Sequence, residues 1–210
     1  MYDKMFEFVN KHLENNDCEA SKIGFFRFRK RTEHIMRVFT WARRLVDSEV
    51  CVNKEAVLVS AIFHDVGYAL KEDNTKHAEN SATLCKKYLN DNGFDTEFTD
   101  FIVYLVKNHS NKELMTSKDT PLELILLMEA DLLVETGALS IIWDCMMEGA
   151  QEIQTFEKTY DHILNYSYKA LTKDPMITPK GKEFWESKRK LVQEFVNQLS
   201  YDLGLNYTKI

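Results

Sequence analysis

Apolar residues recur at helical spacing along most of the chain, and this periodicity limits the fold more than any other feature. Side chains three and four positions apart share one face of an α-helix. The clearest stripe consists of Ile35, Val38, Phe39, Ala42, Leu45 and Val46. Further helices are predicted over residues 78–89, 98–106, 122–135, 137–149, 152–171 and 181–203. Only seven glycines and three prolines occur in 210 residues, whereas strand-rich domains use more turn residues. The sequence therefore predicts an all-α fold.

The segment 54–66 is apolar nearly all round, which predicts a central buried helix. It nevertheless ends on an ionisable pair, His64 and Asp65. Burying such groups costs several kcal/mol unless they are paired or bound to a metal. Gly67 and Gly93 lie where helices are expected to end with a glycine cap. The loops are expected to be short and polar, with the longest over residues 110–120.

Composition excludes several classes of function. The net charge of -6 argues against a general nucleic-acid binder, because such proteins usually carry a basic surface. The four cysteines form no C-x-x-C pair, so reduced thiols are the simplest interpretation. The N-terminus lacks the apolar region of a secretory signal, and no stretch approaches the roughly 20 apolar residues of a membrane span. We expect a cytoplasmic protein without nucleic-acid or membrane partners.

Four more ionisable residues lie on or beside the inward faces of predicted helices. They are His34, His77, His109 and Asp131. Each alone is consistent with a structural role, as a hydrogen-bonded histidine or a buried ion pair. Together with the pair at 64–65, they predict a cluster in which a divalent cation neutralises the carboxylates. Imidazole and carboxylate ligands suit Mn, Fe, Co, Ni or Zn, and Mg is kept as a further candidate metal.

The ordered motifs resemble those of the HD-domain superfamily of metal-dependent phosphohydrolases. The resemblance covers about residues 25–135 and lies in "RTEHIMRVFTWA", "SAIFHDVGYAL" and "LLMEADLL", with "HAENSA" and "IVYLVKNH" between the last two. It implies a compact HD-domain helical bundle with additional C-terminal helices. The implied metal ligands are His34, His64, Asp65, His77, His109 and Asp131.

The resemblance leaves open whether one or two ions bind. In two-metal members of the family, the equivalent of Asp65 bridges the ions, and those of His34, His64 and Asp131 complete one of them. His77 and His109 then bind the second ion, whereas in single-metal members the equivalent histidines face the phosphate.

The implied activity is hydrolysis of a nucleotide or another small phosphorylated metabolite by metal-bound hydroxide. Asp65 is the candidate catalytic residue, which orients or deprotonates the nucleophile. Arg31 and Arg37 flank His34 on one helix face and, with Lys71, are candidates for binding the substrate phosphate. Two alternatives remain open: a di-iron oxygenase of the same fold, and a non-catalytic sensor that holds a metal or ligand.

The expected organisation is a single HD-type domain over residues 1–210. Its core spans about 25–135, and a C-terminal helical extension spans about 137–205. No catalytic motif falls in the extension, so we expect it to complete the pocket wall or to form a homodimer contact.

Overall fold

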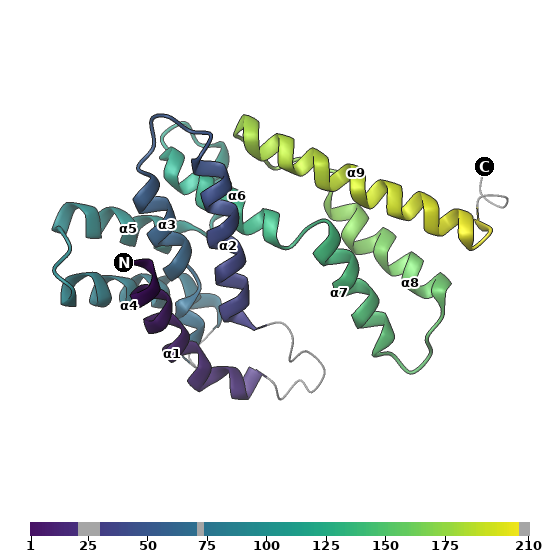
Figure 1. Ribbon diagram of the computed structural model, residues 1–210, viewed down its shortest axis with the longest axis horizontal. Helices are drawn as coiled ribbons and strands as arrows, with labels where there is room; N and C mark the ends of the chain where they lie inside the picture. Colours follow the sequence, from purple (N-terminus) through teal and green to yellow (C-terminus); the bar gives the residue numbers. More distant parts are fainter. Residues whose placement is uncertain (21–29, 71–73, 206–210) are drawn as a thin grey trace. The chain divides into compact units, whose positions relative to one another are not determined.

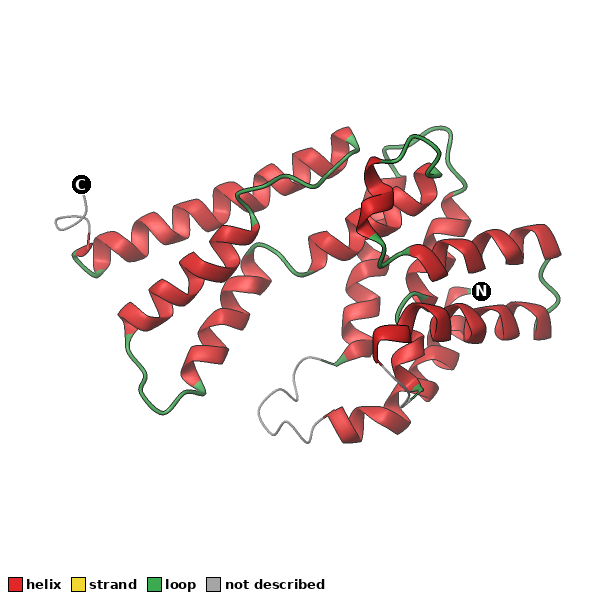
Figure 2. Ribbon diagram, turned by 180° about the vertical axis from the view of Figure 1, so that it is seen from behind, coloured by secondary structure: helices red, strands yellow, loops and turns green. Residues whose placement is uncertain are grey.

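The structure is a computed structural model that describes residues 1–20, 30–70 and 74–205 (Figure 1). Every regular element in these residues is helical, as the colouring in Figure 2 shows, so the all-α prediction is confirmed for this part of the chain. The chain divides after Asp131 into two compact units, residues 1–131 and 132–210. The assignment of both units to one HD-type domain stays a prediction.

The first unit is built from helices α1 to α6, and α6 continues across the boundary. Their bounds are α1 Tyr2–Ala20, α2 Arg31–Val46, α3 Lys54–Phe63, α4 His77–Asp91, α5 Thr96–Asn108 and α6 Leu122–Val134. Helix α3 packs against both α2 and α5, and α4 lies along α5. The helical stripes predicted from the sequence thus form the inner faces of this unit.

Helix α3 is the buried helix that the sequence predicts. Asn53 caps its first turn, where the side-chain oxygen accepts a hydrogen bond from the Ala56 N–H at 3.0 Å. Its side chains from Ala56 onward are almost all buried, up to Phe63. The α-helix ends there, and residues 66–69 form a short 3-10 helix instead. The ionisable pair therefore lies at the junction between the two helices.

Gly67 does not cap α3, so the prediction for this glycine is wrong. Its backbone is not in the left-handed region, whereas Gly93 has φ 72° and caps a helix as predicted. Gly67 instead packs against the start of α4, and its N–H donates to Ser81 Oγ at 2.8 Å. A Cβ atom on Gly67 would lie 2.1 Å from the His77 carbonyl oxygen. The missing side chain thus brings the turn after Asp65 close to α4.

The second unit contains α7, α8 and α9. Their bounds are α7 Ala138–Gly149, α8 Phe156–Ile163 and α9 Pro179–Asp202. The prediction of one helix over residues 152–171 is wrong at its start, because Thr155 caps α8 through a hydrogen bond from the Lys158 N–H. A π-helical turn over residues 164–168 then follows α8 directly.

A partly buried polar cluster joins α7 to α8 within the second unit. The His162 imidazole lies between two carboxylates, with Nδ1 at 2.7 Å from Glu148 Oε1 and Nε2 at 3.5 Å from Asp144 Oδ1. Asp144 also accepts hydrogen bonds from the hydroxyl and the N–H of Ser167. Burial raises the pKa of Asp144, although Ser167 and His162 partly offset this effect. The cluster thus ties the π-helical turn to α7.

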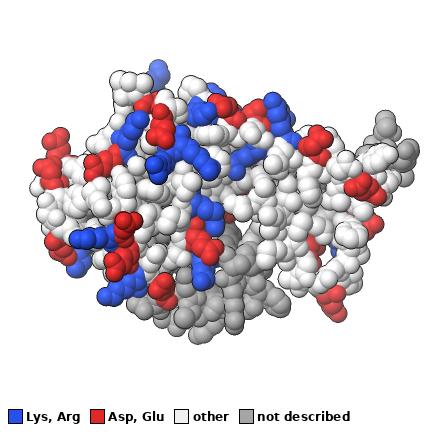
Figure 3. Space-filling model, in the orientation of Figure 1, with Lys and Arg blue, Asp and Glu red and all other residues white. Residues whose placement is uncertain are grey.

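Helix length and surface charge bear on the partners predicted from the sequence. Among the described residues, no helix combines the length and the apolar character needed to cross a membrane. On the face drawn in Figure 3, Lys and Arg side chains are interspersed with Asp and Glu. The absence of a nucleic-acid partner stays a prediction that rests on net charge.

Candidate metal centre

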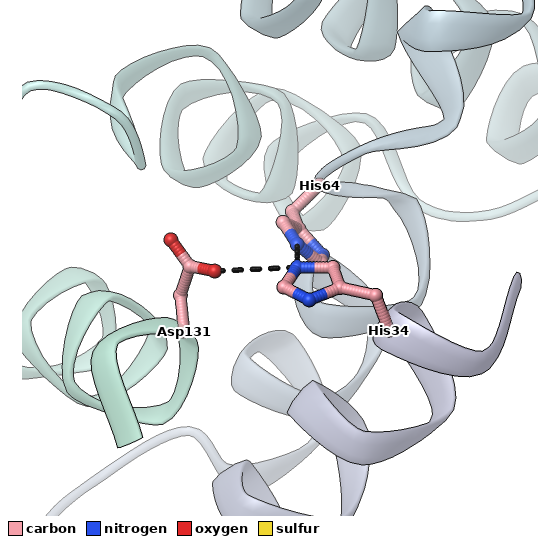
Figure 4. Close-up of side chains that lie close together, drawn as sticks. All are labelled: His34, His64 and Asp131. Carbon is pink, nitrogen blue, oxygen red and sulfur yellow. Dashed lines mark hydrogen bonds and ion pairs between the residues drawn. The ribbon is translucent and has the colours of Figure 1, made fainter. Parts of the chain in front are cut away.

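Three helices of the first unit place His34, His64 and Asp131 side by side (Figure 4). His34 extends from the first turn of α2, His64 follows the last residue of α3, and Asp131 extends from α6. The Nε2 atom of His34 lies 3.2 Å from Nε2 of His64 and 3.3 Å from Oδ1 of Asp131. Both imidazoles are buried, whereas the Asp131 side chain is 22% exposed. One face of this group is therefore accessible.

Asp65 lies at the centre of a wider cluster, and its two oxygens face different histidines. Oδ2 is 3.4 Å from Nε2 of both His34 and His64. Oδ1 is 3.5 Å from Nε2 of His109 and 3.8 Å from Nε2 of His77. The carboxylate thus stands between two pairs of imidazole nitrogens.

Helix ends fix the orientation of two of these imidazoles. His64 and His109 each follow the last residue of an α-helix, where backbone carbonyls have no partner within the helix. Their Nδ1 atoms lie 2.8 Å from the Ala61 carbonyl oxygen and 2.7 Å from that of Val106. Because a carbonyl can only accept, Nδ1 carries the proton and donates to it, and Nε2 is the ring nitrogen directed at the cluster.

The charges of the cluster suit a cation. Burial lowers the pKa of His64, although Asp65 partly offsets this effect, so the imidazole is neutral near pH 7. Burial alone would raise the pKa of Asp65, but His64, His109 and Arg31 outweigh it and hold that pKa well below its usual range. Burial likewise raises the pKa of Asp131, but a hydrogen bond from His34 and the Lys112 ammonium group bring it below its usual value. Both carboxylates are ionised at neutral pH.

The donor set fits one or two transition-metal ions. Ligand atoms about 2.1 Å from the same ion lie about 3.0–3.4 Å from one another. The separation of 3.2 Å between the His34 and His64 nitrogens and the 3.3 Å from His34 to Asp131 fall in that range. Within the part of the chain that the structure describes, two groups of side chains meet the geometric requirement for holding an ion: His34, His64 and Asp131, and His64, Asp65 and His109. Both groups combine imidazole with carboxylate, which suits Mn, Fe, Co, Ni or Zn.

The structure brings together all six side chains predicted as metal ligands, while their role as ligands stays a prediction. Among the predicted phosphate-binding residues, Arg31 lies at the cluster, with Nη1 at 2.7 Å from Asp65 Oδ2. The Nη1 atom of Arg37 lies 3.7 Å from Oε2 of Glu33 on the same helix, and its role in phosphate binding stays a prediction. Lys71 is outside the described residues.

Two further residues at the cluster were not predicted. Lys112 donates to Asp131 Oδ2 at 2.9 Å, from a 3-10 helix inside the predicted loop 110–120. In the sequence, the one feature that could have indicated Lys112 is its position three residues after His109. Tyr68 stacks on the His77 ring with 4.6 Å between centroids, and the Arg31 guanidinium lies 4.1 Å from the Tyr68 ring centroid.

The fold and the cluster together define a class of all-α protein that gathers histidines and aspartates from several helices into one group with the geometry to hold a metal ion. The HD domain family model matches residues 31–135, which contain all six candidate ligands. The chain therefore belongs to the HD domain family, as its motifs predict.

Solved structures share this fold over nearly the whole chain. An HD-superfamily hydrolase from Bacillus thuringiensis has 20% identity and a TM-score of 0.70, with 96% of each chain covered. A predicted HD-superfamily hydrolase from an uncultured Thermotogales bacterium has 18% identity and a TM-score of 0.66, covering 96% of this chain and 92% of its own. Bacillus subtilis YpgQ, solved in complex with ADP, has 21% identity and a TM-score of 0.64, covering 96% of this chain and 97% of its own. No curated protein matches the chain.

Proposed function

We propose that the chain is a metal-dependent phosphohydrolase acting on a nucleotide or another small phosphorylated metabolite. The observation that carries the proposal is the position of Asp65, whose two oxygens face separate histidine pairs. This arrangement supports two metal positions that share one carboxylate. His34, His64 and Asp131 would complete the first position, and His77 and His109 the second.

Bound divalent ions would polarise a phosphoryl oxygen and lower the pKa of a water molecule, which is the chemistry that hydrolysis of a phosphate ester requires. Asp65 stays ionised at neutral pH, so its carboxylate can orient an attacking water molecule by accepting a hydrogen bond. The Arg31 side chain is 35% exposed and already pairs with Asp65. Its remaining N–H groups can therefore donate to a phosphate oxygen from the solvent side.

The substrate class is proposed from chemistry and from one relative. The cluster holds two carboxylates that each have a cationic partner, so bound metal ions would make it positive and attractive to phosphate. YpgQ shares the fold and was solved with ADP, which makes nucleotides the first compounds to test.

The experiment is a turnover assay on nucleoside mono-, di- and triphosphates and generic phosphoesters, with Mn, Co, Ni, Fe, Zn or Mg. We expect phosphate or pyrophosphate release that Asp65→Asn abolishes. Asp100→Asn is the matched control, because this aspartate is exposed on α5 and pairs with Lys86. Oxygen consumption by the aerobically purified, iron-containing protein, without phosphate release, would support the di-iron oxygenase instead. Metal or ligand binding without any turnover would support the sensor.

A further inference from the structure

Lys112 contacts both halves of the candidate metal centre. Its Nζ atom lies 2.9 Å from Oδ2 of Asp131, which belongs to the first ligand group. The same atom lies 3.0 Å from the carbonyl oxygen of His109, which belongs to the second. The short helix that starts at Lys112 follows His109 closely, so the backbone holds the ammonium group beside the cluster.

The ammonium group is placed to bind a ligand that arrives from solvent. It has three N–H donors, and the two contacts to Asp131 and His109 use two of them. The Lys112 side chain is 33% exposed, whereas the imidazole of His109 is buried. Among the described residues, the ammonium group has these two partners, which leaves the third N–H of this partly exposed side chain for a ligand.

Charge balance gives this lysine a role beyond neutralising Asp131. Before a metal binds, Asp65 and Asp131 are balanced by Arg31 and Lys112. With a divalent ion bound at the first position, Asp131 would be neutralised by two cations. The Lys112 ammonium group would then carry charge in excess of its carboxylate partner and could stabilise an anion beside it.

We infer that Lys112 is a phosphate-binding residue of this site. It holds Asp131 by Oδ2, which leaves Oδ1 directed at His34 and the metal position, and it donates its remaining N–H to a phosphate oxygen of the substrate. This role rests on the proposed phosphohydrolase function, and it adds Lys112 to the candidate phosphate-binding residues.

The test is calorimetric binding of inorganic pyrophosphate to the Mn-loaded protein, with metal content measured in each sample. Lys112→Gln removes the charge, and Lys112→Arg keeps it. Lys107→Gln is the matched control, because Lys107 is an exposed lysine on α5, five residues before Lys112 in the sequence. We expect Lys112→Gln to weaken binding by about tenfold or more with unchanged metal content, because a hydrogen bond to a charged group is lost. Lys112→Arg and Lys107→Gln should stay within about threefold of the parent protein.

Each other outcome contradicts a different part of the reasoning. If the parent protein binds pyrophosphate and Lys112→Gln binds it equally well, the role of Lys112 is overturned while the proposed function stands. If Lys112→Gln loses metal together with pyrophosphate, the lysine serves only to position Asp131, and the phosphate contact is overturned. If the Mn-loaded parent protein does not bind pyrophosphate, the phosphohydrolase proposal fails, and the role of Lys112 fails with it.

Discussion

Gly67 offers a sharp test of how the turn after the His64-Asp65 pair is held. In Gly67→Ala, the new Cβ would lie 2.1 Å from the His77 carbonyl oxygen and 2.5 Å from the Ser81 backbone nitrogen. Both atoms belong to the backbone of α4 and cannot rotate away, so the turn and the helix must separate by about 1 Å to reach ordinary contact. This displacement would move the His77 ring away from Asp65.

The expected cost of Gly67→Ala follows from this overlap. Overpacking a buried site costs about 1–3 kcal/mol, and a clash with backbone atoms on two sides favours the upper end of that range. One kcal/mol lowers Tm by about 2–4 °C in a protein of this size, so we expect a decrease of about 6–12 °C. The assay is thermal unfolding of the metal-free protein followed by far-UV circular dichroism.

Gly149→Ala is the matched control for this substitution. Gly149 ends α7, and its backbone is not in the left-handed region. Beyond its own helical turn, no atom of the described residues lies within 4 Å of the position that a Cβ would take. Its Tm should change by less than about 2 °C. A Gly67→Ala protein as stable as this control, with unchanged metal content, would refute the close packing of the turn on α4.

The remaining predictions concern acid stability and substrate binding. Because the pKa of His64 is lowered in the folded state, the unfolded chain binds this proton first, and the stability of the metal-free protein should fall as pH drops through about 6.5. The lowered pKa values of Asp65 and Asp131 should cause a further loss of stability below about pH 4. In Asp131→Asn, the free energy of unfolding from urea titrations should depend less steeply on pH in this range. An unchanged pH dependence would contradict the lowered pKa of Asp131. Arg31→Ala should raise KM for a phosphorylated substrate by about tenfold and more than Arg37→Ala, because the Arg31 guanidinium contacts Asp65 whereas that of Arg37 lies near Glu33. Equal effects in steady-state kinetics would contradict this difference.

The helices are predictable because each buries one face. The stripe from Ile35 to Val46 appears as the inner face of α2, and α9 lies close to its predicted range. The sequence also predicts which histidines and aspartates lie together, because their order along the helices matches one family. These successes rest on local periodicity and on motif order.

The predictions fail where a residue's role depends on a distant segment. Gly67 is predicted to end a helix, but its role is set by contact with α4. The helix start near residue 152 is misplaced because Thr155 caps the helix later. Lys112 was not predicted as a site residue, because it lies in a predicted loop and its contact with Asp131 depends on the path of a short 3-10 helix. Such contacts have no periodic signal in the sequence.

The central claim is that two divalent ions bind at the candidate centre and share Asp65. Crystals of the Mn-loaded protein, measured at the manganese absorption edge, test it most directly. We predict two anomalous peaks that share Asp65, one beside His34, His64 and Asp131 and the other beside His77 and His109. A map with a single peak, or with no peak within bonding distance of these side chains, would contradict this claim.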